Sequence, residues 1–459
     1  MIISPAGSQQ QKYKDRRTER RPSTSSSSNA SLGSSFNRTQ TNEQKLAASI
    51  IEDMKKHVRE VTEQPYGDLK SPFHNPGVGP RRDLKLDEIF TNLIIYEGRV
   101  EYDFLGDRME QLKEYNKANE NLRPTLPGNI FAAKKRKILV VGRPGIGKTM
   151  FSTKILRDWA SDTSFNKTQK SQMDFEFAFL IKMSMFNSRS KKLNLRELLD
   201  HSEYSTALSE EIWNYIRDNP EGVLVIFDGF DEYSYRTEIG KDDVPYTNNE
   251  EDRMPVHSLL KKIVTGNILT GATVLITTRP NAMSCVRSLN FNRAVEILGF
   301  TTEQVNDYVR KFTKLEDKAE TIRQHITSNL NLLAFCYIPV NCFIICSCLL
   351  ELLVNTSLTS LHYLPTRLTE IYSITIKMFY FSYDDGQYRH NKTEGQQFFL
   401  KPFKELPSSV QKEFTHLGKI ASDGIKEGRL IFDSHELNDL ESNGLFHRLP
   451  DTKDHPLAE

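Results

Sequence analysis

Residues 137–160 are expected to form, in order, a strand, a glycine-rich loop and a helix, and no other stretch constrains the fold as strongly. Ile138 to Val141 is a short apolar run with β-branched residues and no helical period, which predicts a buried strand of a parallel sheet. Gly142 ends this run, and Met150 to Trp159 is expected to be helical. The pattern predicts an α/β fold in which helices flank a parallel sheet.

The loop between strand and helix, GRPGIGKT at 142–149, has the spacing glycine, any four residues, glycine, lysine, threonine. This spacing is typical of the P-loop NTPases, in which backbone N–H groups surround the phosphates of a nucleotide. Lys148 is expected to contact the β and γ phosphates and Thr149 to bind Mg²⁺, while the helix directs its N-terminal dipole at the anion. The residues expected to contact the nucleotide are Gly142, Arg143, Pro144, Gly145, Ile146, Gly147, Lys148, Thr149 and Met150.

A second apolar run, VLVIFDGFDE at 223–232, ends in three carboxylates. It predicts a strand that ends at Asp228, and in a P-loop protein an acid at this place holds Mg²⁺, mostly through water. Asp231 and Glu232 follow within reach of the γ-phosphate, where a carboxylate can orient the attacking water, so both are candidate catalytic residues. The competing interpretation is an acidic turn at the end of a strand.

A third run, TVLITT at 273–278, predicts another strand, and Arg279 follows it. An arginine at the carboxyl end of a strand can sense the γ-phosphate through charge-assisted hydrogen bonds, which makes Arg279 a third candidate catalytic residue. The competing interpretation is an ordinary surface arginine.

The composition of the 459-residue chain is that of a soluble globular protein with some polar tail. A formal net charge of +1 gives no sign of bulk electrostatic binding to nucleic acid or anionic lipid. The N-terminus has no apolar core long enough for a secretory signal. The five cysteines, an odd number, suit a reducing compartment better than a disulfide framework, so the expected location is the cytoplasm.

Leu332 to Val354 is an apolar stretch long enough to span a bilayer. It contains Pro339, Asn341 and Glu351, and an acidic residue within a membrane helix costs about 2.5–3.5 kcal/mol. A spanning helix is therefore one interpretation, and a buried core helix that starts after Pro339 is the favoured one.

The N-terminal residues 1–42 are rich in Ser, Gln and Arg and lack periodicity, which predicts a disordered tail. The basic run from Lys12 to Arg21 is either a nuclear or anionic-surface address or a merely solvated segment. Residues 44–62 carry apolar side chains on one helical face and predict an amphipathic helix that packs on the body or binds a partner. Residues 64–80 are rich in proline and glycine and predict a linker.

Beyond Phe300 the pattern becomes helical. Thr301 is expected to cap the helix TEQVNDYVRKF, and further helices are expected at 318–330, 340–353 and 367–381. Leu406 to Phe446 is expected to add helices and a short apolar segment at Arg429–Phe432.

Together these residues resemble a NACHT domain, the nucleotide-binding module of the STAND class of signalling ATPases, which includes the NOD-like receptors. The most specific motifs are GRPGIGKT, VLVIFDGFDE and TVLITTRP. FCYIPVNCFIIC at 335–346 resembles the proline motif of the first helical domain, which implies that Pro339 lies near the adenine. LPTRLTEIY at 364–372 and HELNDLESNGLF at 435–446 resemble segments of a winged-helix domain.

The resemblance predicts the domain organisation. The expected segments are a disordered tail (1–42), an amphipathic helix with a linker (43–83), a pre-NACHT segment (84–136), a nucleotide-binding NACHT domain (137–300), a helical domain (301–363) and a winged-helix domain (364–459). In the family the winged helix continues to a histidine that touches the ADP phosphate, but neither His447 nor His455 lies in that motif. The chain is thus expected to be a fragment, a truncated isoform or a regulator.

The resemblance implies an ATP- and ADP-binding switch with Mg²⁺, used as an innate-immune-like signalling receptor or regulator that hydrolyses ATP slowly. ADP is expected to hold the domains together and ATP to favour self-association. The alternatives are an AAA+-like turnover ATPase and a nucleotide-binding scaffold without hydrolysis. A GTPase is disfavoured because the chain has no Asn-Lys-x-Asp motif.

Overall fold

A computed structural model of the chain describes residues 42–63, 86–91, 94–97, 130–131, 135–163, 175–187, 192–203, 208–241, 246–355, 364–382 and 398–427. The chain divides into two units, Met1–Thr41 and Asn42–Glu459, and every described residue belongs to the second unit. Residues 1–41 of the predicted disordered tail, the predicted linker, the apolar segment Arg429–Phe432 and the winged-helix motif at 435–446 lie outside the described residues. Asn42, the last residue of the predicted tail, is helical.

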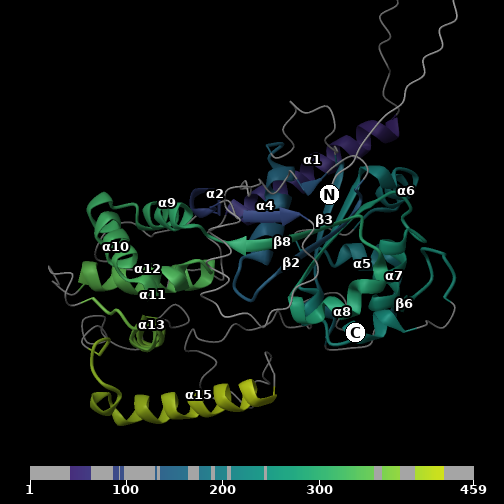
Figure 1. The fold of residues 1–459 in the computed structure, drawn as a ribbon. Coiled ribbons are helices and arrows are strands. Elements are labelled where there is room, and N and C mark those ends of the chain that lie inside the picture. The colour runs from purple at the N-terminus through teal and green to yellow at the C-terminus, as the bar shows by residue number, and fades with distance from the viewer. Residues whose placement is uncertain are drawn as a thin grey trace, which may run out of the picture. The chain divides into compact units, whose positions relative to one another are not determined.

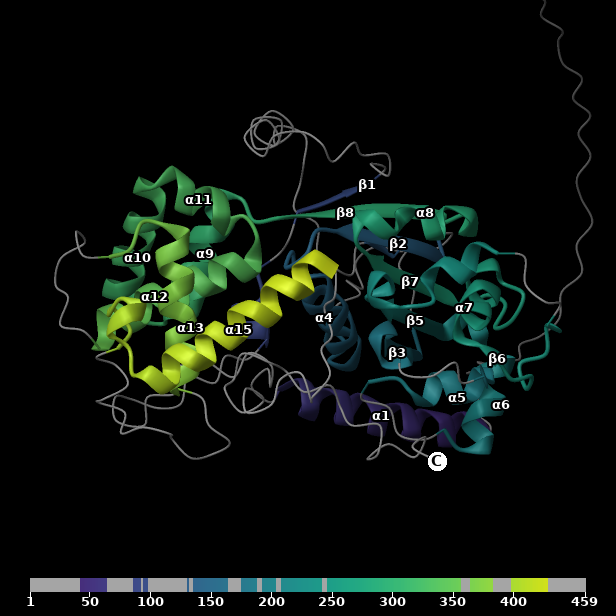
Figure 2. The same cartoon turned by 90° about the horizontal axis from the view of Figure 1, so that it is seen from below.

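A six-stranded sheet forms the centre of this unit, with the strand order β1-β8-β2-β7-β5-β3 (Figures 1 and 2). All neighbours pair in parallel except β1, which runs antiparallel to β8 at one edge. The strands are β1 (Ile94–Glu97), β2 (Lys137–Gly142), β3 (Phe177–Lys182), β5 (Val223–Asp228), β7 (Thr273–Thr278) and β8 (Arg293–Gly299). The expected α/β fold with a parallel sheet is confirmed.

The central strands are continuous apolar runs because both faces of the sheet are covered. Every residue of β5 and β7 is buried. Helix α4 (Lys148–Ala160) lies on one side of the sheet and α7 (Val256–Thr265) on the other (Figure 2), as right-handed crossovers in opposite directions require. The domain also contains the helices α5 (Leu195–Asp200), α6 (Glu210–Asp218) and α8 (Met283–Val286). A separate two-stranded sheet is formed by β4 (Lys192–Leu193) and β6 (Met254–Pro255).

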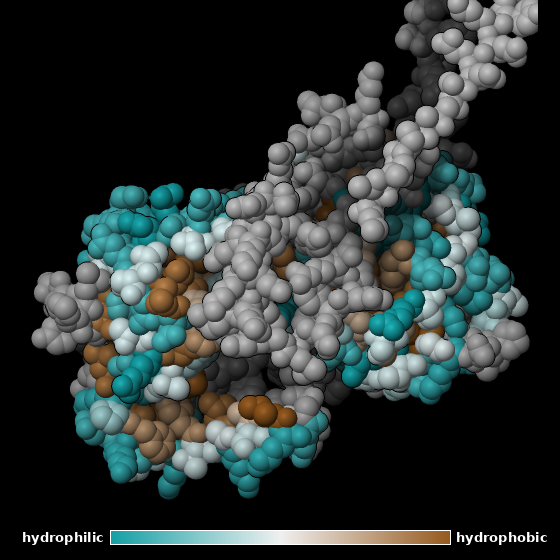
Figure 3. All heavy atoms as spheres, viewed as in Figure 1, coloured by the Kyte–Doolittle hydropathy of each residue, from teal (hydrophilic) through white to brown (hydrophobic). Residues whose placement is uncertain are grey.

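Strand β8 connects the sheet to a helical region, which begins with α9 (Thr302–Thr313). Its N-cap is Thr301, as expected, and Thr301 and Gln304 form a reciprocal capping box. The region continues with α10 (Glu316–Ser328), α11 (Leu330–Cys336), α12 (Pro339–Asn355), α13 (Leu368–Ser382) and α15 (Ser408–Glu427). Its surface exposes several large apolar side chains, and apolar atoms are visible on this side of the molecule in Figure 3.

Helix α12 contains most of the apolar stretch that suggested a membrane span. It starts at Pro339, as the core-helix interpretation requires, and its Cys342, Cys346 and Cys348 are buried free thiols. Within the part of the chain that the structure describes, no helix combines the length and apolar character that crossing a membrane needs.

The predicted amphipathic helix is α1 (Asn42–Glu63), and it packs on the body of the protein. Ala47, Met54 and Val58 are buried, and α1 lies against α4. At its C-terminal end, Arg59 Nη1 donates to the carbonyl of Ala160, the last residue of α4. The packing interpretation of this helix therefore holds for the side chains that the structure describes.

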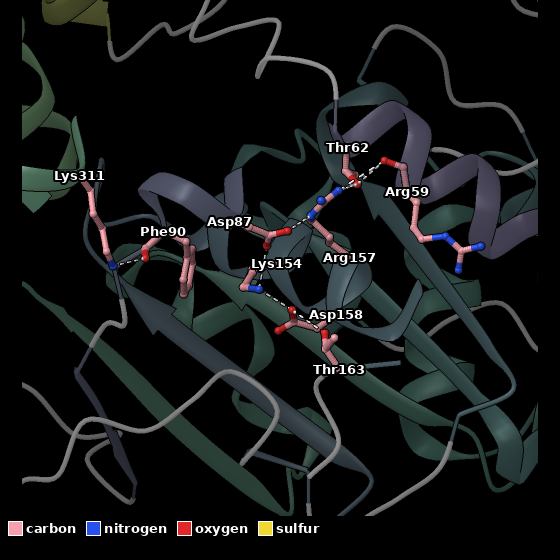
Figure 4. A network of polar contacts seen from close by, with 9 residues as sticks. All are labelled: Arg59, Thr62, Asp87, Phe90, Lys154, Arg157, Asp158, Thr163 and Lys311. Atoms are coloured by element: carbon pink, nitrogen blue, oxygen red, sulfur yellow. Dashed lines mark hydrogen bonds and ion pairs between the residues drawn. The ribbon is translucent and has the colours of Figure 1, made fainter. Parts of the chain in front are cut away.

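The predicted pre-NACHT segment (84–136) contributes helix α2 (Leu86–Ile89) and strand β1. Asp87 in α2 makes ion pairs with two residues of α4, at 3.0 Å to Lys154 Nζ and 2.5 Å to Arg157 Nε (Figure 4). On the other side, the carbonyl of Phe90 accepts a hydrogen bond of 3.0 Å from Lys311 of α9, and Glu88 pairs with Lys314. The α2 segment therefore joins the helix after the phosphate loop to the helical region.

Arg136 and Lys137 stabilise loops at the amino edge of the sheet. Arg136 Nη1 donates to the carbonyls of Glu221 and Gly271 at 2.9 and 2.8 Å, and Lys137 Nζ donates to the carbonyl of Thr265. These contacts give the two side chains a structural role.

Candidate nucleotide-binding site

The strand order brings the predicted site residues to one edge of the sheet. Strands β2, β7 and β5 are neighbours, with Val141 opposite Thr278 and Phe227 opposite Ile276. The phosphate loop follows β2 and Arg279 follows β7, while Asp228 is the last residue of β5. Ligands of open α/β sheets bind at this edge.

The phosphate loop turns sharply between β2 and α4. Gly145 has φ +70° and Gly147, the N-cap of α4, has φ +97°, a left-handed conformation that favours glycine. Lys148, Thr149 and Met150 form the first turn of α4, whose leading N–H groups have no partners within the helix itself. The loop therefore offers the anion-binding geometry that its sequence predicted.

Lys148 is folded back over this loop. Its Nζ donates to the carbonyls of Gly142 at 2.9 Å and Arg143 at 3.2 Å. Burial lowers the pKa of Lys148, although the negative charges of Asp231, Asp228 and Glu232 oppose this shift. Lys148 and the acidic residues after β5 thus share one electrostatic environment.

Asp228, the last residue of β5, is 4% exposed. Its Oδ1 accepts hydrogen bonds from the hydroxyls of Ser152 at 3.0 Å and Thr277 at 2.6 Å. The sequence analysis named neither hydroxyl. Ser152 lies four residues after Lys148, one helical turn further along α4. This spacing was the sequence signal that could have placed Ser152 on the same face of the helix as Lys148.

Asp231 holds Arg279 at two points. Its Oδ2 lies 2.7 Å from Arg279 Nε, and its Oδ1 accepts a 3.0 Å hydrogen bond from the backbone N–H of Arg279. Asp231 is nearly buried, with 4% of its side chain exposed. Both oxygens of this carboxylate are therefore engaged by the predicted sensor arginine.

Glu232 is in a different environment, since 43% of its side chain is exposed. Its Oε1 lies 3.6 Å from Arg279 Nη2. Burial of the carboxyl, followed by the charges of Asp231 and Asp228, raises the pKa of Glu232, although Arg279 and Lys148 act in the opposite direction. The backbone of this turn is fixed by Asn187, whose Nδ2 donates to the carbonyl of Glu232 at 2.7 Å.

The start of α12, where Pro339 lies, contacts the tip of the phosphate loop. The N–H of Val340 donates to the carbonyl of Gly145 at 3.2 Å, and a Cβ on Gly145 would lie 2.3 Å from Val340 Cγ1. Arg143 Nη1 also donates to Tyr337 Oη at 3.3 Å. This loop therefore needs glycine at position 145 for its φ angle and for its contact with the helical region.

The donor groups at this edge suit a Mg²⁺–nucleotide complex. Mg²⁺ in such sites is usually held by one or two protein oxygens together with phosphate oxygens and water. Thr149 supplies an exposed hydroxyl, and Asp228 has one oxygen, Oδ2, beyond the one that accepts from Ser152 and Thr277. The structure thus brings all the predicted site residues to the phosphate loop and the strand ends beside it.

Comparison with known proteins identifies a matching family and several similar proteins. The sequence profile of the NACHT domain family matches residues 136–316. The chain is 26% identical to Protein NLRC5 of Ictalurus punctatus over 365 residues, which cover 78% of this chain and 20% of that protein. It is 31% identical to NACHT, LRR and PYD domains-containing protein 12 of Homo sapiens over 219 residues, which cover 47% of this chain and 19% of that protein.

A third relative is Nucleotide-binding oligomerization domain-containing protein 2 of Bos taurus. It is 27% identical over 309 residues, which cover 65% of this chain and 27% of that protein. The chain therefore spans about a fifth to a quarter of the length of these relatives.

Proposed function

Because this chain is a NACHT-domain protein, with that domain at residues 136–316, we propose that it is an ATP- and ADP-binding molecular switch. The observation that carries the proposal is the meeting of three groups at one edge of the sheet: the phosphate loop with Lys148, the buried carboxylate of Asp228, and Arg279. A cation, a metal-binding acid and a phosphate sensor in one place are what a Mg²⁺–triphosphate needs.

The nucleotide is assigned to the phosphate loop in this proposal. The backbone of residues 142–150 surrounds the phosphates, Lys148 contacts the β and γ phosphates, and the Pro339 segment lies near the adenine. When Mg²⁺ is bound, it neutralises charge on the β and γ phosphates, and Thr149 and Asp228 are the residues that would hold it.

The two acidic candidates receive different roles. Glu232 is partly exposed and has a raised pKa, so it suits the orientation of the attacking water. Asp231 has both oxygens on Arg279, so it is better suited to position that arginine. Slow hydrolysis would then return the ATP state to the ADP state.

The switch acts through unequal affinity, because a ligand shifts a conformational equilibrium only by its preference for one state. Arg279, Lys148 and Mg²⁺ are the groups that distinguish ATP from ADP. We further propose that the ATP state self-associates and that the protein serves as a cytoplasmic, innate-immune-like signalling receptor or regulator. Support comes from the relatives, one of which has nucleotide binding and oligomerization in its name.

The test is to purify the protein, identify any bound nucleotide by chromatography, and measure ADP affinity by calorimetry. The Lys148→Ala variant is expected to bind ADP roughly 10- to 100-fold more weakly, since a charge-assisted contact is worth about 1.5–3 kcal/mol. Lys56→Ala is the control, because 67% of the Lys56 side chain on α1 is exposed. Unchanged nucleotide binding by Lys148→Ala would refute the proposal.

Two alternatives predict different kinetics. An AAA+-like ATPase would hydrolyse ATP at a steady rate over many turnovers, whereas a scaffold would bind ATP and leave it intact. Single-turnover and steady-state phosphate release from the purified protein separates these two from a slow switch.

A further inference from the structure

We propose that Ser152 and Thr277 are positioning residues, whose hydroxyls orient the carboxylate of Asp228 so that its Oδ2 is directed to Mg²⁺. The inference rests on the proposed function, because it concerns the metal that accompanies the nucleotide. It assigns a role to two residues that the sequence analysis did not predict as site residues.

Both hydroxyls donate to the same oxygen of Asp228. Ser152 Oγ lies 3.0 Å and Thr277 Oγ1 2.6 Å from Oδ1. A carboxylate oxygen has two lone-pair positions, so two donors use the hydrogen-bonding capacity of Oδ1 and leave that of Oδ2. All three side chains are buried, with exposures of 0% for Ser152, 4% for Asp228 and 0% for Thr277, so bulk water does not easily replace these donors.

The direction of the Thr277 hydrogen bond is determined by its second partner. The backbone N–H of Gly229 donates to Thr277 Oγ1 at 2.8 Å. Because an amide nitrogen can only donate, Thr277 Oγ1 accepts from it, and the single hydroxyl hydrogen is available for Asp228. The amide of the turn after β5 thus orients Thr277, and Thr277 orients the carboxylate at the end of β5.

The two donors to Asp228 come from two different elements. Ser152 lies on α4, one turn after Lys148, and Thr277 lies on β7, two residues before Arg279. Asp228 is therefore tied both to the helix of the phosphate loop and to the strand that carries the sensor arginine. Rotation of the carboxylate about its Cβ–Cγ bond would break one or both bonds, so they hold the orientation of Oδ2.

A positioning role predicts a specific defect. Residues that orient a metal ligand typically change metal affinity by 10- to 100-fold when they are removed. Ser152→Ala and Thr277→Val are expected to raise the Mg²⁺ concentration needed for half-maximal tightening of ADP binding by roughly tenfold or more. ADP affinity in EDTA is expected to stay within about twofold of the parent value, because the phosphate loop and Lys148 are unchanged.

The experiment measures ADP binding by calorimetry at increasing Mg²⁺, with a parallel series in EDTA, for the parent and the variants. Thr277→Ser keeps the hydroxyl and is expected to retain the parent's Mg²⁺ dependence. Thr273→Val is the matched control, since it removes a buried threonine hydroxyl at the opposite end of β7. Ser152→Ala provides the test on its own if Thr277→Val does not fold.

Two results would overturn the inference: an unchanged Mg²⁺ requirement in both hydroxyl-deleting variants, or an equal loss of ADP affinity with and without Mg²⁺. A failure of the proposed function looks different, because then the parent protein itself binds no ADP.

Discussion

At the scale of single residues, the charge of Lys148 is the property most open to measurement. Burial lowers the pKa of Lys148, and the nearby carboxylates only partly offset this effect. A bound polyphosphate adds negative charge beside the ammonium group and therefore raises its pKa. Nucleotide binding is thus expected to be coupled to the protonation of this side chain.

The sign of the coupling follows from linkage. ADP affinity should be highest at pH values below the lowered pKa of Lys148 in the ligand-free protein. It should fall as the pH rises through that pKa, by at most about tenfold per pH unit. Lys148→Arg is the matched control, because an arginine stays charged throughout this range. Calorimetric titrations from pH 7 upward, with the melting temperature followed in parallel, make the test. An equal decline in the arginine variant would show that another group titrates.

The residues of the candidate site differ in how far the sequence could predict them. The phosphate loop is one contiguous motif, so its members could be named without any knowledge of tertiary structure. Ser152 and Thr277 act on Asp228 across 76 and 49 residues of sequence, and only folding brings the three together. The same holds for the contact of Gly145 with Val340, which depends on how the helical region packs.

At the scale of elements, strands with both faces buried were the easiest to predict. Strands β5 and β7 are uninterrupted apolar runs, and β7 has the expected limits. Strand β8 was not named because RAVEILG carries Arg293 and Glu296, which break the run. Strand β1 pairs with β8 across about 200 residues of sequence, and a local pattern contains no information about such a partner.

The α2 segment is the element whose role the sequence left most open. Asp87 pairs with Lys154 and Arg157 of α4, and Phe90 accepts a hydrogen bond from Lys311 of α9 (Figure 4). Glu88 pairs with Lys314, which follows α9 directly. Burial alone would raise the pKa of Asp87, but the hydrogen bonds and charges of Arg157 and Lys154 outweigh it, so the net pKa is lowered. The ion pairs therefore stabilise the folded state when Asp87 is ionised.

Asp87→Asn is expected to lower the free energy of unfolding at pH 7 by roughly 0.5–1 kcal/mol, a value kept small because the side chain is 44% exposed. Since the folded-state pKa lies below the unfolded one, this difference should be constant above the unfolded value and disappear as the pH falls through the folded value. Urea unfolding of parent and variant between pH 3 and 7 measures it. Asp53→Asn, on the exposed face of α1, is the control and should change stability little. A difference that persists at the acid end would contradict the assignment.

At the scale of the whole molecule, the proposed switch requires that the nucleotide state be communicated from the strand ends to the helical region. Two connections are available: the phosphate loop contacts the start of α12 through Gly145, and the α2 segment joins α4 to α9. Both connections begin at elements that hold the phosphates in the proposed function. A change at the γ-phosphate therefore has a short path to helices α9 and α12.

If the ATP state self-associates as we propose, its lifetime sets the size of the particle in solution. Replacing Glu232 by glutamine removes the carboxylate that we assign to orienting water while keeping the size of the side chain. General-base residues typically contribute 10²–10⁴-fold to rate, so hydrolysis should slow by about that factor.

Because ATP then persists, light scattering should show a larger, longer-lived assembly with ATP than the parent forms, and no difference with ADP. Glu238→Gln is the matched control, since Glu238 follows Glu232 by one short segment and pairs with Lys241. A Glu232→Gln variant that hydrolyses ATP at the parent rate would transfer the water-orienting role to Asp231, and one that retains ATP without assembling would separate self-association from the nucleotide state.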